Sequence, residues 1–210
     1  MRLFAWLLRS FFYLLYHPLA WTYDLVAWTV SLGRWRSWVN SALPWLAGPR
    51  ALELGHGPGH LQVKMRNKGL LSFGLDRSPQ MGRLAIRNSR KVGAVAKLTR
   101  GDALHLPFGS GSFDQVVATF PSEYIFEPQT LSEVHRVLAA KGVFIVLPLA
   151  WITGKSVPDR LAAWLFRVTG QAGEWQPRFT EGIAAAGFAV EEDRKDLGSS
   201  EVLLIVAQKK

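Results

Sequence analysis

The residues with the clearest chemical meaning in this chain are an acid and three glycines in alternation: Glu53, Gly55, Gly57 and Gly59. They follow a short apolar run that is predicted to be a strand, and they precede a predicted helix. Glycines at alternate positions let the backbone turn sharply and leave no Cβ between it and a ligand. The first N–H groups of the following helix have no partner within that helix. The pattern therefore predicts a seat for a nucleotide-like cofactor between a strand and a helix.

The spacing differs from that of a dinucleotide site. The dinucleotide fingerprint G-x-G-x-x-G would place its third glycine at position 60, where this chain has His60. It also places a pyrophosphate on the helix N-terminus, where the carboxylate of Glu53 would be unfavourable. A nicotinamide oxidoreductase is therefore a weak alternative. The simpler alternative is a tight strand–helix turn that binds no ligand.

Two further acids stand at the ends of predicted strands. Asp76 follows the apolar run 71–75, and Asp102 follows the run 95–99 within Gly101-Asp102-Ala103. In an open α/β sheet, ligands bind beyond the carboxyl ends of the strands. A carboxylate offers acceptor sites only, so Asp76 can take both hydroxyls of a ribose. The alternative for Asp76 is an acid that caps a helix or a turn.

The elements that must position these residues alternate from residue 50 onwards, which predicts a doubly wound α/β sheet. The predicted strands are 51–54, 71–75, 95–99, 113–119 and 143–147, closed by an antiparallel pair, 188–193 and 202–207. The predicted helices are 60–68, 78–89, 128–139, 159–168 and 179–186. We divide the chain into an N-terminal segment, 1–46, and a domain, 47–210, with an irregular apolar insertion at 149–176.

Five motifs in this order carry a family resemblance. They are Glu53-Leu54-Gly55-His56-Gly57-Pro58-Gly59, Gly74-Leu75-Asp76-Arg77-Ser78-Pro79-Gln80-Met81, Gly101-Asp102-Ala103 with Leu106-Pro107-Phe108, Phe113-Asp114-Gln115-Val116-Val117, and Glu133 to Val143. Together they make residues 50–148 resemble the class I S-adenosylmethionine (SAM) methyltransferases, in the branch of the ubiquinone/menaquinone C-methylases. The family's usual Leu-x-Pro-Gly-Gly is Leu-Ala-Ala-Lys-Gly here, which keeps Gly142 at the turn.

The resemblance implies a Rossmann-like, seven-stranded and mostly parallel sheet with an antiparallel closing strand. It implies SAM as cofactor, S-adenosylhomocysteine as product, and no metal. The three glycines would approach the methionine and ribose parts of SAM, and Asp76 would bind the ribose. Asp102 would accept from the adenine amino group, and the Ala103 N–H would reach a ring nitrogen. Glu53 would stabilise the loop or face the ammonium group through water. Other expected cofactor contacts are Arg77, Met81, Phe120 and Tyr23.

Candidate catalytic residues follow the fourth predicted strand. Glu123 is the candidate base or substrate-orienting carboxylate, with Tyr124 beside it. The alternative for Glu123 is a solvated loop acid. The tetrapeptide Asn/Asp-Pro-Pro-Tyr, typical of enzymes that methylate exocyclic base amines, is absent, although Pro121 and Tyr124 are present.

The N-terminal segment is apolar and aromatic, with six of the nine tryptophans in residues 1–46. It contains two apolar runs, Leu3–Tyr16 and Leu19–Leu32, separated by His17-Pro18, and Arg9 interrupts the first. Neither run reaches the ~20 uninterrupted apolar residues of a spanning helix. We expect residues 2–16 to form a helix in the membrane interface, and a second helix, about 19–32, to cover the cofactor as a lid. The alternative is that both helices pack on the domain.

The charge of the chain is concentrated. The net charge is +9, and residues 61–100 hold ten Lys or Arg and one acid. Such a face can bind nucleic acid or an anionic bilayer, or it can simply be solvated. Aromatic residues do not interleave with the basic ones, so we expect no nucleic-acid partner. With no cysteine, disulfides and thiolate metal sites are excluded.

The apolar lid and the apolar insertion predict a small lipophilic acceptor, such as a quinone-like ring or a membrane lipid. The alternatives are a SAM-binding, membrane-associated module without turnover, and a nucleic-acid methyltransferase that uses the basic 61–100 face. We expect a cytoplasmic protein that contacts the inner face of the membrane through residues 1–16.

Overall fold

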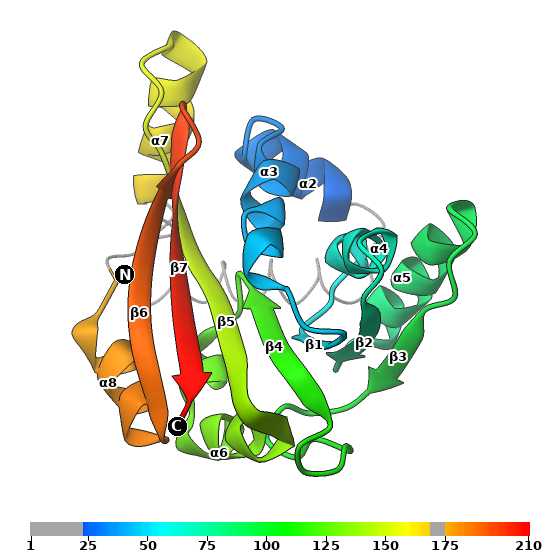
Figure 1. The fold of residues 1–210 in the computed structure, drawn as a ribbon. Helices are drawn as coiled ribbons and strands as arrows, with labels where there is room; N and C mark the ends of the chain where they lie inside the picture. The colour runs from blue at the N-terminus through cyan, green and yellow to red at the C-terminus, as the bar shows by residue number, and fades with distance from the viewer. Residues whose placement is uncertain (1–22, 169–174) are drawn as a thin grey trace, which may run out of the picture.

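The structure, a computed structural model, describes residues 23–168 and 175–210. A seven-stranded sheet with the order β3-β2-β1-β4-β5-β7-β6 forms its centre (Figure 1). The strands are β1 (Arg50–Leu54), β2 (Leu71–Asp76), β3 (Lys97–Arg100), β4 (Phe113–Thr119), β5 (Leu138–Ile152), β6 (Phe188–Asp196) and β7 (Ser200–Lys209). β1 to β5 are parallel, and β7 is antiparallel to both β5 and β6. The predicted sheet, with its antiparallel closing strand, is confirmed.

Helices cover both faces of the sheet (Figure 1). They are α2 (Tyr23–Val30), α3 (Trp35–Asn40), α4 (His60–Asn67), α5 (Pro79–Lys91), α6 (Pro128–Val137), α7 (Val157–Val168) and α8 (Pro177–Ala185). Two 3-10 turns, η2 (Leu43–Trp45) and η3 (Glu123–Phe126), complete the described elements. α4 and α5 pack on β2 and β3, whereas α6 and α8 pack on β5, β6 and β7.

The alternation of side chains along β1 separates two core clusters. Leu52 and Leu54 belong to the cluster shared with α6 and α8, and Ala51 belongs to the cluster shared with α3 and α4. Glu53 lies on the same face as Ala51, since its side chain contacts Gln62 of α4. An acid at the end of a buried strand is thereby placed under the first helix of the domain.

The turn between α6 and β5 differs from the prediction. The predicted helix 128–139 ends at Val137, and Leu138 already pairs with Phe113 of β4. The register then shifts, and regular pairing resumes at Val143 with Gln115. Lys141 takes the left-handed conformation, with φ 60°. Gly142 is needed for close approach, because an added Cβ would stand 2.9 Å from the Ala139 carbonyl oxygen and 3.1 Å from that of Asp114. Residues 149–152, expected to be irregular, continue β5 because they pair with β7.

The N-terminal segment is described only from residue 23. The predicted interface helix 2–16 and the first four residues of the predicted lid helix 19–32 lie outside the described residues. Of the remainder, residues 23–30 form α2, and a turn with Leu32 at φ 51° ends the helix two residues earlier than predicted. The sequence did not predict α3, whose Trp38 is fully buried and donates from Nε1 to Ser200 Oγ at 2.8 Å. Within the described ranges, no helix combines the length and the apolar character needed to cross a membrane.

Candidate functional site

The glycine loop joins β1 to α4, and all three predicted glycines have left-handed φ: 69° at Gly55, 50° at Gly57 and 79° at Gly59. Gly55 has a neighbour where a side chain would stand, since an added Cβ would lie 2.9 Å from the Tyr124 hydroxyl oxygen. An added Cβ on Gly57 would meet no atom within 4 Å. The loop therefore has space directly above Gly57, which is the arrangement that a ligand lying against the backbone requires.

Asp76 ends β2 and faces this loop. Its Oδ2 accepts the Gly57 N–H at 2.9 Å, and its Oδ1 accepts the Ser78 N–H at 2.8 Å. Each carboxylate oxygen can accept two hydrogen bonds, so each keeps one acceptor position. Asp76 thus acts as the turn acid of the alternative interpretation and still has capacity for two donors from a ligand.

Glu53 lies beneath the loop, with 2% of its surface exposed. Gln62 Nε2 donates to Glu53 Oε2 at 2.8 Å and to the Phe73 carbonyl oxygen at 3.0 Å. Burial raises the pKa of Glu53 to about 8; the Gln62 hydrogen bond opposes the rise, and the charge of Asp76 adds to it. Glu53 is therefore mostly protonated at neutral pH. Its burial favours the loop-stabilising role over direct contact with a ligand.

His56 also supports the loop, and the sequence did not predict this role. Its ring is buried, and Nδ1 lies 2.7 Å from the Gly57 carbonyl oxygen. A carbonyl only accepts, so Nδ1 carries the proton. Burial lowers the pKa of His56, which keeps the ring neutral. The ring packs over Gly74, where an added Cβ would stand 2.9 Å from His56 Cδ2. The sequence feature that could have indicated this role is the position of His56 between Gly55 and Gly57.

The loop after β3 brings Asp102, Ala103 and Arg77 together. Asp102 Oδ1 accepts the Leu104 N–H at 3.0 Å, and Asp102 Oδ2 lies 3.6 Å from Arg77 Nε. The Arg77 side chain is 79% exposed, so this ion pair contributes little stability. The Ala103 N–H has no hydrogen-bond partner among the described residues. The two predicted adenine contacts are therefore neighbours in one short segment, where the Asp102 carboxylate can accept and the Ala103 N–H can donate.

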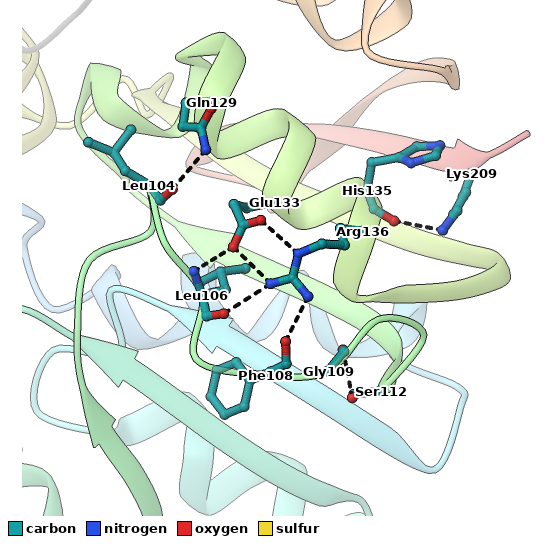
Figure 2. Close-up of polar contacts among 10 residues, drawn as sticks. All are labelled: Leu104, Leu106, Phe108, Gly109, Ser112, Gln129, Glu133, His135, Arg136 and Lys209. Atoms are coloured by element: carbon teal, nitrogen blue, oxygen red, sulfur yellow. Dashed lines mark hydrogen bonds and ion pairs between the residues drawn. The ribbon is translucent and has the colours of Figure 1, made fainter.

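An ion pair on α6 fixes the loop that carries these groups (Figure 2). Arg136 donates to both carboxylate oxygens of Glu133, at 2.7 and 2.8 Å. Glu133 Oε2 accepts the Leu106 N–H at 2.7 Å, while Arg136 donates to the carbonyl oxygens of Leu106, at 3.0 Å, and Phe108, at 2.8 Å. The hydrogen bonds from Arg136 lower the pKa of Glu133. The motif residues of α6 thus hold the backbone of residues 106–108 and make no contact with the glycine loop.

The segment after β4 contains a strained aromatic residue. Phe120 has φ 49°, a conformation that costs a non-glycine residue of order 1 kcal/mol or more. Its N–H donates to the Leu147 carbonyl oxygen at 2.7 Å, and its ring stacks on Trp35 of α3 with the centroids 4.3 Å apart. Tyr124, on η3, reaches Gly55, whereas Glu123 is exposed and its side chain contacts no described polar group. The structure therefore brings Tyr124 to the loop and leaves Glu123 beside it.

Two predicted contacts remain open. Met81 is fully buried within α5, so its side chain presents no surface to a ligand in this structure. The side chain of Tyr23 lies outside the described part of the structure. Both assignments stay predictions.

Comparison with known proteins agrees with this geometry. Residues 52–146 match the family described as "Methyltransferase domain". Over these residues, just under half of the chain, the sequence is similar to the SAM-dependent methyltransferases. It is 36% identical over 104 residues to the demethylmenaquinone methyltransferase of Thermus thermophilus, covering 48% of this chain and 47% of that protein. It is 28% identical over 172 residues to the ubiquinone/menaquinone biosynthesis C-methyltransferase UbiE of Bartonella quintana, covering 76% of this chain and 66% of that protein.

A solved structure shows the same methyltransferase fold. The geranyl diphosphate C-methyltransferase of Streptomyces coelicolor, in complex with Mg²⁺, geranyl diphosphate and S-adenosylhomocysteine, superposes with a TM-score of 0.63. The two share 15% identity, and the match covers 83% of this chain and 79% of that one. The chain spans about half to two thirds of the length of the two curated relatives it matches.

Proposed function

We propose that this methyltransferase transfers a methyl group from SAM to a small lipophilic acceptor, a quinone-like ring or a membrane lipid. One observation carries the proposal: the glycine loop, with open space above Gly57, lies against the carboxylate of Asp76 at the end of the neighbouring strand. That pairing suits a ligand with a flat region against the backbone and a diol against the acid.

The described groups fit SAM better than a dinucleotide. Asp76 keeps two acceptor positions for ribose hydroxyls, and Ala103 offers an N–H for a ring nitrogen. Glu53 is buried and mostly protonated at neutral pH, so its role is to support the loop. SAM carries a sulfonium and an ammonium and no phosphate, so the carboxyl groups of Asp76 and Asp102 favour it.

The protein's own contribution to the transfer is positioning and exclusion of water. SAM supplies, when bound, a methyl group already activated for in-line displacement. The stacked rings of Phe120 and Trp35 form an apolar wall after β4, on the edge of the sheet where ligands bind. Tyr124 and Glu123 are our candidates to orient the acceptor. A base is needed only where the acceptor must lose a proton.

The lipophilic acceptor is supported by the relatives and by the composition of the chain. The two curated relatives are named for demethylmenaquinone and for ubiquinone/menaquinone biosynthesis. The solved structure of the fold contains a prenyl diphosphate. In this chain, α2, α3 and α7 are rich in Trp, Leu and Val. α3 packs on β5 and β7 near Phe120, and α7 follows the carboxyl end of β5 (Figure 1). These helices give an apolar acceptor an apolar route to the sheet edge.

Calorimetric titration of the full-length protein with SAM, S-adenosylhomocysteine and NADH, each alone, tests the cofactor. We expect micromolar binding of the first two and none of NADH. Labelled SAM offered with extracted quinones and lipids then tests transfer. Binding without transfer to any acceptor would support a module without turnover, and binding of NADH instead would overturn the proposal.

Contact between residues 1–16 and the inner face of the membrane is a separate part of the proposal, because these residues lie outside the described ranges. Co-sedimentation of the protein with liposomes, with and without residues 1–16, tests it. Equal partition of both forms would refute a membrane role for this segment.

A further inference from the structure

Helix α7 presents an unusually apolar exposed face. Val157, Leu161 and Trp164 are 79%, 58% and 53% exposed. Their spacing of four and three residues places them on one side of the helix. Single exposed apolar residues are normal, but three large ones on one helical face indicate a surface that binds something.

Helix α2 and the turn after it also expose large apolar residues. Leu25 and Trp28 of α2 are 64% and 62% exposed and stand three residues apart, and Leu32, in the turn that follows, is 38% exposed. Together with Val157, Leu161 and Trp164, these residues form what we call the apolar rim. Figure 1 shows α2 and α7 at the same end of the molecule, beyond the carboxyl ends of β4 and β5.

A partly buried ion pair connects the two halves of the apolar rim. Arg34, in the turn between α2 and α3, donates to Asp159 in the first turn of α7, and its Nε donates to Ser199 Oγ at 2.8 Å. Hydrogen bonds from Ser156 and Arg34 lower the pKa of Asp159, so the acid stays ionised and paired. The apolar rim is therefore held to one body, which lets both faces meet one partner.

The charges near the apolar rim are mainly positive. Arg36, Lys155 and Arg160 are exposed. Residues 24–41 and 153–164 hold four Lys or Arg and two acids, Asp24 and Asp159, and Asp159 is 5% exposed in its ion pair. An exposed acid, Asp196, ends β6 at the turn into β7. Trp and Leu beside an excess of Lys and Arg match the headgroup region of an anionic bilayer. A second copy of the chain would bring the same positive charges against these, so self-association is disfavoured.

We propose that the apolar rim docks this protein on an anionic lipid bilayer. The occupant is the lipid surface, with the tryptophans at headgroup depth and the cations on lipid phosphates. Docking itself does not depend on methyl transfer. Its link to a lipophilic acceptor does rest on the proposed function, since the docked face would place the Phe120 edge of the sheet next to the bilayer.

Vesicle flotation with the full-length protein tests the docking. The vesicles are phosphatidylcholine with or without phosphatidylglycerol, and the variant carries Leu161→Glu and Trp164→Glu. The matched control is Val95→Glu, because Val95 is 72% exposed in the loop between α5 and β3, beside the basic α5. We expect wild type to bind the anionic vesicles, the α7 variant to bind at least about tenfold more weakly, and the control to change less than about twofold.

Three results would overturn the proposal. The α7 variant binding like wild type would assign any membrane contact to other residues. An equal loss in Val95→Glu would assign it to the α5 surface. Absence of vesicle binding by wild type, with a change of oligomeric state in the α7 variant by light scattering, would make the apolar rim a self-association surface.

Separate measurements distinguish this inference from the proposed function. SAM titration should give the same affinity in wild type and in the α7 variant, because the substitutions lie outside the cofactor site. Coincident thermal unfolding curves show that the variant is folded. Normal vesicle binding by a protein that transfers no methyl group would support the apolar rim and contradict the proposed function.

Discussion

Replacing Glu53 with Gln should stabilise the protein increasingly as the pH rises. The folded-state pKa of Glu53 is about 8, against an ordinary value of 4.5. A carboxyl whose pKa is raised by folding stabilises the fold at pH values below its ordinary pKa, and this stabilisation is lost as the pH rises toward the folded value. Gln keeps the size of the side chain, remains neutral throughout, and retains an oxygen that can accept from Gln62.

The magnitude follows from proton linkage. Between pH 4.5 and about 8 the folded state holds one more proton than the unfolded state, so wild type loses about 1.4 kcal/mol of stability per pH unit through this group. From about pH 5.5 to about pH 7.5 the loss is about 2 to 3 kcal/mol. Other titrating groups act in both proteins, so the difference between wild type and Glu53→Gln isolates Glu53.

Urea unfolding followed by tryptophan fluorescence at several pH values measures this difference. Glu191→Gln is the matched control, because Glu191 is exposed on β6 and the chemical change is the same. The control should follow wild type at every pH. Parallel profiles of wild type and Glu53→Gln, within about 0.5 kcal/mol, would refute a protonated Glu53 beneath the loop.

Three further predictions concern the site. Asp76→Ala should weaken SAM binding at least about tenfold in calorimetry, because two ribose hydroxyls lose a charged acceptor; unchanged affinity would overturn the ribose assignment. Gly57→Ala should lower the free energy of unfolding in urea by about 1 kcal/mol because of its left-handed φ. It should also weaken SAM binding by more than about 1 kcal/mol, because the added methyl group enters the open space above the loop. Arg136→Leu should lower stability by about 2 kcal/mol, because Glu133 and two carbonyl groups lose charged donors, and it should weaken SAM binding several-fold through the Asp102 segment. Hydrogen exchange at residues 102–108 should rise; unchanged exchange would show that the Glu133–Arg136 pair does not hold this loop.

Much of the sheet could be predicted because its strands are apolar runs bounded by glycine or by acids. β4 was predicted with its observed bounds, and the pairing of β6 with β7 was predicted correctly. The errors lie where tertiary pairing overrides local pattern. Residues 149–152 follow Pro148 and resemble a loop, yet pairing with β7 extends β5 through them. No local signal in residues 138–142 indicates that Lys141 takes the left-handed turn.

The candidate site was predictable in its backbone and less so in its side chains. The positions of the glycines and of Asp76 follow from strand ends and turn geometry, which the sequence encodes locally. The protonation of Glu53 depends on Gln62 and on burial by α4, and the neutral ring of His56 depends on Gly74 of the next strand. Such properties arise from contacts between separate segments, so single-sequence patterns do not contain them.

The protein residues that we assign to cofactor binding are held mainly by hydrogen bonds with the backbone. This explains which motifs can be recognised in the sequence. Asp76 is oriented by the N–H groups of Gly57 and Ser78, and the loop of Ala103 is held at its following residues by the Glu133–Arg136 pair. A site built in this way tolerates many side chains around it but needs glycine where backbone meets ligand and an acid at each strand end. It also makes affinity depend on residues that never touch the cofactor, which is why the Glu133–Arg136 pair on α6 should affect SAM binding.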